Sequence, residues 1–151
     1  MLELIVTGDA LKLDHIEWAD LSPVLRQFRA YMVQQTDRMF EEAGHPGSAL
    51  LGGPEVRGVR WEAVKTGYKR RPSGKSISPM SALLQDTGRL RQLAATEITQ
   101  VTPTSLVMGT RLPYAAAQNA HRPFLFITDE DADHLQVLVD RHYGLESPKS
   151  V

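Results

Sequence analysis

Cations gather in one short segment of the chain, and their type and spacing suit contact with phosphate groups or acidic surfaces. Five of them lie within residues 65–75 with no acid between them: Lys65, Lys69, Arg70, Arg71 and Lys75. Basic side chains bind the nucleic-acid backbone by charge but do not by themselves read its sequence. Pro72 and Gly74 interrupt the run, which indicates a surface loop. The loop would contact DNA or an acidic partner, or would serve only to keep the surface solvated.

The end of this segment matches half of a phosphate-binding P-loop. Gly74-Lys75-Ser76 supplies the last three residues, but Lys69 stands where the motif requires its first glycine. No apolar strand leads into the segment. We therefore predict no nucleotide or other cofactor site here.

An acidic stretch further along the chain is the best candidate for a metal site, but its spacing argues against one. Thr128 is followed by four carboxylates and a histidine: Asp129, Glu130, Asp131, Asp133 and His134. An EF-hand loop needs a glycine and a glutamate at positions where this chain has neither. Thr128 with Asp131 instead matches the capping pattern of a helix start. The histidines form no zinc pair and the serines no nucleophile elbow. We predict no catalytic or metal site, and a protein that is not an enzyme.

Composition narrows the class of protein further. The chain has 151 residues, which suits a single domain over residues 1–151. Its net charge of −1 argues against a general nucleic-acid-binding protein. The absence of cysteine excludes disulfides, thiol catalysis and cysteine-based metal sites. Neither a signal peptide nor a membrane span is visible, so we expect synthesis in the cytoplasm and no membrane contact.

The spacing of apolar residues predicts an α+β fold with a long N-terminal amphipathic helix, a small antiparallel sheet with a hairpin, and a C-terminal helix. The long helix is expected to begin with Ser22 as its cap and to end at Gly44. Residues 2–6 are predicted to form a strand, and residues 44–82 a long loop. Asp86 or Thr87 would cap a short helix. The remaining expected elements are a hairpin of strands 98–101 and 106–110, a turn or short helix at 113–120, a strand at 124–127, a helix from Thr128 to Gly144, and a frayed tail at 145–151.

The order of several short segments resembles a known family. The run begins with Leu84-Gln85-Asp86-Thr87-Gly88-Arg89-Leu90 and continues through Val107-Met108-Gly109-Thr110, Tyr114-Ala115, Arg122-Pro123-Phe124-Leu125 and Thr128-Asp129-Glu130-Asp131. It is similar to the phage virion morphogenesis family, the tail-completion proteins of Mu-like and related tailed phages. The match spans roughly residues 24–143. Gln118-Asn119 depart from the family, which often has His-Gln and then a glycine at this point.

The resemblance implies a structural role without catalysis. Members of this family finish the tail at its head-proximal end, or let it join the filled head, as rings around the DNA channel. The implied location is the virion, at the neck, after assembly in the host cytoplasm. The implied partners are further copies of the chain (a hexameric ring), the tail tube protein, head–tail connector or stopper proteins, and genomic DNA in the channel.

An aromatic residue and an arginine near a short alanine-rich turn suggest an interface between subunits or partners. The candidate residues are Tyr114, Arg122, Pro123 and Phe124; the alternative is ordinary core packing beneath the hairpin. The strand at 2–6, isolated at the terminus, could add to the sheet of a neighbouring copy. Two other functions stay open: a small nucleic-acid-binding module that uses residues 65–75, and a hydrolase or nucleotide-dependent enzyme.

Overall fold

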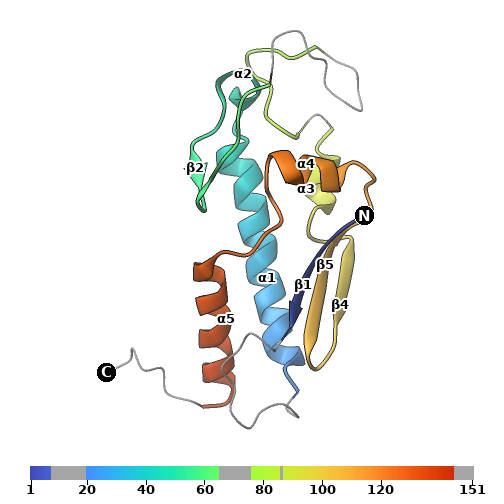
Figure 1. The fold of residues 1–151 in the computed structure, drawn as a ribbon, viewed down its shortest axis with the longest axis vertical. Coiled ribbons are helices and arrows are strands. Elements are labelled where there is room, and N and C mark those ends of the chain that lie inside the picture. The colour runs from blue at the N-terminus through green and yellow to red at the C-terminus, as the bar shows by residue number, and fades with distance from the viewer. Residues whose placement is uncertain (8–19, 65–75, 86, 145–151) are drawn as a thin grey trace, which may run out of the picture.

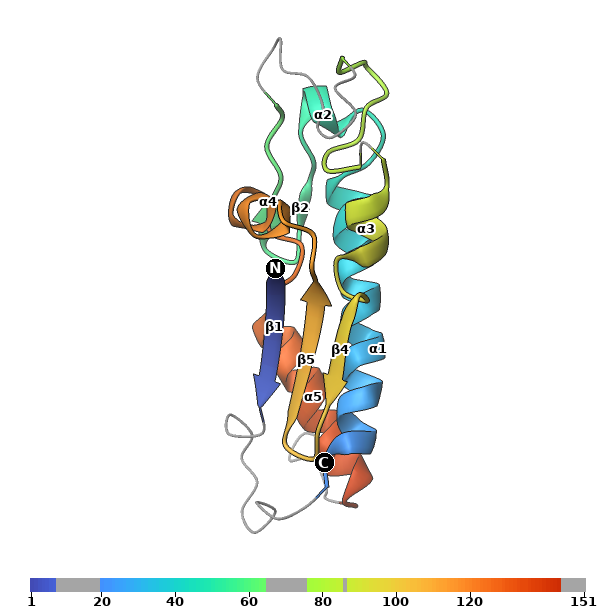
Figure 2. The same cartoon turned by 90° about the vertical axis from the view of Figure 1, so that its right-hand side faces the viewer.

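Along residues 2–7 exposed side chains alternate with less exposed ones, as expected for a strand of which helices cover only one face. The computed structural model describes residues 1–7, 20–64, 76–85 and 87–144. Strands β1 (Leu2–Thr7), β4 (Ile98–Val101) and β5 (Ser105–Thr110) form an antiparallel sheet in the order β1-β5-β4. Helices α1 (Ser22–Arg38) and α5 (Asp129–His142) lie behind one face, and no described element covers the other (Figures 1 and 2). The predicted α+β class is confirmed.

Helix α1 is the longest element and connects the two ends of the molecule (Figure 2). Its buried face includes Val24, Leu25, Phe28 and Met32, which belong to the apolar stripe expected from the sequence. The last turn, Met39–Ala43, is π-helical and is labelled η2. The helical run then ends at Gly44, as predicted.

Two expectations about the start of this helix are wrong. The helix is not the N-terminal element, because β1 precedes it and α1 begins only at residue 22. Ser22 is the first helical residue rather than the cap. The Asp20 carboxylate accepts bonds from the Ser22 backbone N–H, at 2.9 Å, and from the Ser22 hydroxyl. Asp20 therefore takes the capping role that the sequence suggested for Ser22.

Strand β1 is not isolated. It pairs with β5 along its whole length, from Leu2 opposite Thr110 to Thr7 opposite Ser105. The hairpin of β4 and β5 forms as predicted, with Ile98 opposite Gly109. Strand β1 is thus already part of a sheet within its own chain, and only its outer edge is free of described strands.

The region predicted as a loop at residues 44–82 contains short elements. They are α2 (Ser48–Leu51) and a hairpin of β2 (Glu55–Val56) and β3 (Val59–Arg60). The basic residues Lys65, Lys69, Arg70, Arg71 and Lys75 lie outside the described residues. So do Asp86 and residues 145–151, whose expected capping role and frayed state remain predictions.

The last third of the chain follows the predicted order with one exception. Short helices form at α3 (Arg89–Leu93) and α4 (Ala115–His121). Gly88, in a left-handed conformation, precedes α3, and the Thr87 hydroxyl accepts a 3.3 Å bond from the backbone N–H of Arg89, the first residue of the helix. Residues 124–127 form no strand. The start of α5 has the predicted capping box, in which Thr128 and Asp131 bond reciprocally.

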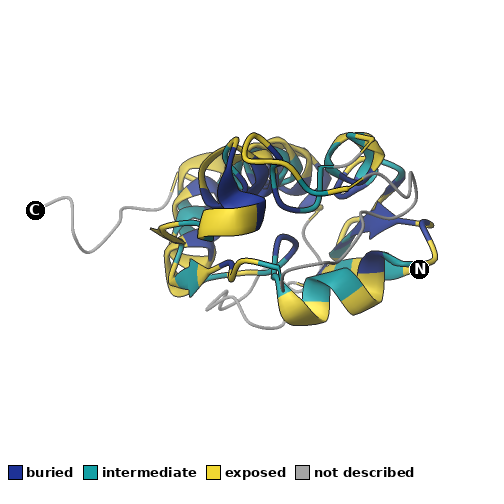
Figure 3. Ribbon diagram, turned by 90° about the horizontal axis from the view of Figure 1, so that it is seen from above, coloured by how far each residue is buried: buried dark blue, intermediate teal, exposed yellow. Residues whose placement is uncertain are grey.

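The core lies between the sheet and the two long helices and continues along α1 toward α4. Seen down the long axis, helices and strands each carry buried stretches beside exposed ones (Figure 3). Trp61, Phe28, Phe40 and Phe124 are the largest fully buried side chains. None of the described helices has the length and apolar character that crossing a membrane requires.

Candidate functional site

Three of the four predicted interface residues hold another part of the same chain. Arg122 donates hydrogen bonds to the carbonyl oxygens of Glu62, at 2.9 Å, and Ala63, at 3.5 Å. The carbonyl oxygen of Pro123 accepts a 2.8 Å bond from the indole Nε1 of Trp61. The 122–124 segment therefore fixes the chain at residues 61–63, immediately before the predicted basic loop.

Phe124 belongs to the core. It is fully buried, and its ring centroid lies 5.3 Å from that of Phe40, which in turn meets Trp61 edge to face at 5.4 Å. Asn119 holds the segment from the other side, because its Oδ1 accepts bonds from the backbone N–H groups of Phe124 and Leu125. Phe124 offers no exposed surface to a partner. Tyr114, Arg122 and Pro123 are half-buried and remain candidates.

The last described residues before the basic segment are fixed to the end of the molecule that carries α2 (Figure 1). The backbone N–H of Val64 donates a 2.9 Å bond to the carbonyl oxygen of Ala49 in α2. Together with the bonds from Arg122 to Glu62 and Ala63, this contact fixes residues 62–64, which immediately precede Lys65 in the sequence.

A buried ion pair was not anticipated from the sequence. Arg57 Nη2 donates a hydrogen bond to Asp131 Oδ2, and the two side chains are only 4% and 2% exposed. The other oxygen of Asp131 accepts a 2.8 Å bond from the hydroxyl of Tyr31. The backbone N–H of Thr128 donates to Oδ2 at 2.9 Å. One carboxylate therefore ties α1, the β2–β3 hairpin and the start of α5 together.

The β2–β3 turn presents Arg57 to this carboxylate. Arg57 and Gly58 are the two turn residues between Val56 and Val59, and both have positive φ, at 53° and 80°. Two-residue hairpin turns of this kind favour glycine at the second position. The Arg57 guanidinium also lies 4.4 Å from the ring centroid of Phe126 and donates to that residue's carbonyl oxygen. The sequence signal that could have predicted this turn is Gly58, which lies in the two-residue connection between Val56 and Val59.

The hydrogen bonds around Asp131 favour its charged form. Burial of Asp131 works against its ionisation and would raise its pKa. The hydrogen bonds from Thr128 and Tyr31, together with the positive charge and the hydrogen bond of Arg57, outweigh burial and lower the pKa of Asp131. Arg57 Nη1 is buried without a hydrogen-bond partner among the described residues. A hollow of about 370 Å³ lies beside the cluster, with Gln35, Arg38 and Glu130 among its lining residues. The arrangement is suited to fixing three elements, since the carboxylate is saturated with donors.

The ionisation of Tyr31 offers a test of this cluster. Burial, followed by the bond to Asp131 and its charge, raises the pKa of Tyr31 to about 12 from the usual 10.0. Because the folded-state pKa is raised, the associated stability is fully present below pH 10 and is lost as the pH rises through 12. We expect an absorbance titration at 295 nm to show a delayed tyrosine step near pH 12 that disappears in Tyr31→Phe. Tyr143→Phe is the control, because burial also raises the pKa of that tyrosine. A step near pH 12 that survives Tyr31→Phe but disappears in Tyr143→Phe would contradict the assignment.

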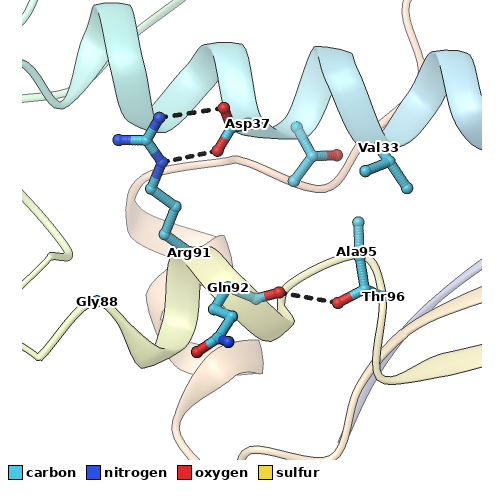
Figure 4. Close-up of a pocket in the computed structure, with 8 residues that line it drawn as sticks. Val33, Asp37, Gly88, Arg91, Gln92, Ala95 and Thr96 are labelled. Carbon is cyan, nitrogen blue, oxygen red and sulfur yellow. Dashed lines mark hydrogen bonds and ion pairs between the residues drawn. The ribbon is translucent and has the colours of Figure 1, made fainter.

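A second hollow, of about 350 Å³, lies between α1 and α3 (Figure 4). Arg91 pairs with the Asp37 carboxylate through two nitrogens, at 2.7 and 3.1 Å. That bond lowers the pKa of Asp37 despite partial burial. Val33 and Ala95 also line the hollow. Unlike Arg57–Asp131, this pair is partly exposed: the side chains of Arg91 and Asp37 are 33% and 50% accessible.

The acidic stretch at the start of α5 serves the helix. Asp131 is bonded as described above, while Asp129 and Glu130 are exposed in the first turn. Across the described residues, no group of three or more histidine, aspartate or glutamate side chains is arranged to hold a metal ion. No family model, curated protein or solved structure matches this chain.

Proposed function

We propose that this chain is a structural virion protein of a tailed phage that completes or terminates the tail and enables head–tail joining. It would act as a ring of copies, hexameric by resemblance, around the DNA channel. Its neighbours would be the tail tube protein and the connector or stopper proteins of the head. The proposal places the protein in the virion, at the head-proximal end of the tail.

The order of the segments that resemble the phage family carries the proposal, and in the structure these segments bond to other parts of the chain. Gln85 donates to the carbonyl oxygens of Phe40 and Gly44 at the end of η2. Thr110 donates to the Glu97 carboxylate at 2.8 Å. Asp131 joins three elements. Residues that hold distant segments together keep the shape of the molecule fixed. A fixed shape suits a protein that acts by binding its neighbours in an assembly rather than by catalysis.

The fixed position of residues 61–64 supports the proposal that the basic segment, which follows them in the sequence, contacts DNA or an acidic partner ring. Residues 61–64 are held by Arg122, Pro123 and Ala49. A ring in which every copy carries these cations at the same place would repeat the positive charge around its axis. Such repetition suits the phosphate backbone, which is recognised through charge.

Neutralising the basic segment tests this contact. We expect Lys69→Gln/Arg70→Gln/Arg71→Gln to reduce the yield of joined particles when the gene complements a phage that lacks it. The reason is the loss of three charges from each copy of the ring. The measurement is the infectious titre, together with a count of unattached tails by electron microscopy.

The matched control removes three exposed arginines elsewhere: Arg26, Arg60 and Arg141. This variant should complement normally, because it lowers the net charge equally but leaves residues 65–75 intact. An undiminished titre for the basic-segment variant would show that these cations are only solvated. Salt-sensitive DNA binding by the purified protein, with normal tail joining, would instead favour a nucleic-acid-binding module.

A further inference from the structure

Neither outer strand of the sheet has a further described strand beside it, although Arg29 of α1 donates a 3.0 Å bond to the Thr99 hydroxyl of β4. Among the described strands, none pairs with β1 or β4 on the side away from β5. Proteins that stay monomeric usually protect such edges with lysine, proline or a bulge. The register of β1 on β5 is continuous over six pairs, so β1 has no bulge, and Glu3 is its one charged residue. Strand β4, with sequence ITQV, has no charge and no proline.

An exposed apolar side chain adjoins one of these edges. Ile5 of β1 is 59% exposed on the open face of the sheet. Val107 of β5 stands opposite Ile5, and Gln100 of β4 stands opposite Val107 on its other side. The three side chains therefore form one row across the open face. A further strand beside β1 would cover Ile5 and satisfy the unpaired backbone groups together.

The directions of the two edge strands make them suitable partners. Strands β1 and β4 are both antiparallel to β5, so they run in the same direction on opposite sides of the sheet (Figure 2). If β4 of a second copy lies beside β1, the new pair of strands is parallel. One copy then keeps its β4 edge free and the other keeps its β1 edge free. Contacts of this head-to-tail type close into rings when the rotation allows it. Contact between two β1 edges would stop at a dimer.

We propose that the β1 edge pairs with the β4 edge of a second copy of this chain, so that the sheet continues from copy to copy. The inference rests on the ring in the proposed function and supplies its interface. It assigns the contact to backbone groups of residues 2–7 and 98–101. In this arrangement the neighbouring copy also covers the exposed side chain of Ile5.

Cysteine pairs test this contact cleanly, because the natural sequence contains no cysteine. Ile5→Cys/Gln100→Cys places both thiols on the open face, and Glu3→Cys/Gln100→Cys samples a register shifted by two residues. Within one copy these strands are separated by β5, about 9–10 Å apart, beyond the span of a disulfide. We expect mild oxidation of the concentrated protein to give a ladder of disulfide-linked species beyond the dimer, for at least one pair. Reduction should collapse it.

The controls separate this contact from others. Ile5→Cys/Thr99→Cys puts the thiols on opposite faces, since Thr99 stands opposite Met108 rather than Val107, and should lose the ladder. The single variants should give no species beyond a dimer. The proposal would be overturned if both open-face pairs gave only monomer after oxidation. It would also be overturned if the opposite-face control gave the same ladder as the open-face pairs. Efficient dimers from Ile5→Cys alone would also overturn it in favour of β1–β1 pairing.

A charge on the edge provides a second measurement without oxidation. Ile5→Lys should abolish any rise of sedimentation mass with protein concentration, whereas Val137→Lys, at another exposed apolar position, should not. A wild-type protein that stays monomeric at all concentrations would refute the edge contact. The proposed function would be judged separately, because tail joining is measured in particles and can proceed through a different interface.

Discussion

Replacing Arg57 with methionine is expected to lower the free energy of unfolding by about 3–5 kcal/mol, the usual cost of removing one partner from a buried ion pair. Methionine keeps much of the apolar stem but leaves the Asp131 carboxylate buried without its counter-charge. The carboxylate would retain bonds from Tyr31 and Thr128 only. Urea denaturation followed by circular dichroism measures the loss.

The partly exposed pair in Figure 4 supplies the matched control. Asp37→Asn breaks the Asp37–Arg91 pair, which joins α1 to α3 but is partly open to solvent. Exposed pairs contribute about 0–1 kcal/mol, so this variant should stay close to wild type. Equal losses in the two variants would contradict the claim that Arg57–Asp131 fixes three elements. The double variant Arg57→Met/Asp131→Asn should lose less than the sum of its single variants, because they share one contact.

The same pair predicts a pH dependence. The folded-state pKa of Asp131 is lowered below the usual 3.8. Its stabilising contribution is therefore present above the unfolded-state pKa and is lost as the pH falls through the folded-state value. In Arg57→Met, by contrast, protonation of Asp131 removes a buried charge that has no counter-charge. The difference in stability between wild type and Arg57→Met should shrink as the pH is lowered below about 4. A difference that widens on acidification would exclude the buried charge as its cause.

Gly109→Ala is expected to detach β1 from the sheet. A β-carbon at this position would overlap the backbone carbonyl of Leu2 in the neighbouring strand. Backbone atoms cannot rotate away as a flexible side chain can, so β1 must move, and the burial of Val6 is lost with it. We expect a loss of about 3 kcal/mol, at the upper end of the usual cost of overpacking. Hydrogen exchange of the β1 amides should accelerate before global unfolding.

Gly88→Ala is the control for this substitution. Gly88 has a positive φ of 76° but no neighbouring atom within 4 Å of a β-carbon. Its replacement should cost about 1–2 kcal/mol through backbone strain alone and should leave β1 protected. Slow β1 exchange in Gly109→Ala, equal to that of the control, would show that the close approach at Leu2 is not a constraint.

Elements specified by neighbouring residues were predictable from the sequence. The stripe of α1, the β4–β5 hairpin and the capping box of Thr128 and Asp131 each depend on residues within a few positions of one another. Predictions from local sequence patterns were wrong where a contact with a distant residue determines the backbone conformation. The apolar run at 124–127 suggested a strand, but Asn119 and Trp61 capture the backbone at residues 123–125.

The candidate site was the least predictable part for the same reason. Arg57 and Asp131 are 74 residues apart, and Tyr31 and Asp131 are 100 apart. Tyr31 was visible only as a member of the helix stripe, and Asp131 only as part of a cap. The pairing of β1 with β5 likewise joins segments far apart in the sequence, Leu2–Thr7 and Ser105–Thr110, and no periodicity within β1 specifies its partner.

Electron microscopy of particles assembled without this protein tests the central claim most directly. The gene would be inactivated in the phage that encodes it, with complementation by the intact gene as the control. The proposed function predicts full heads and separate tails, some with abnormal head-proximal ends, and restored joining on complementation. Intact, infectious particles in the absence of the protein would contradict a role in tail completion.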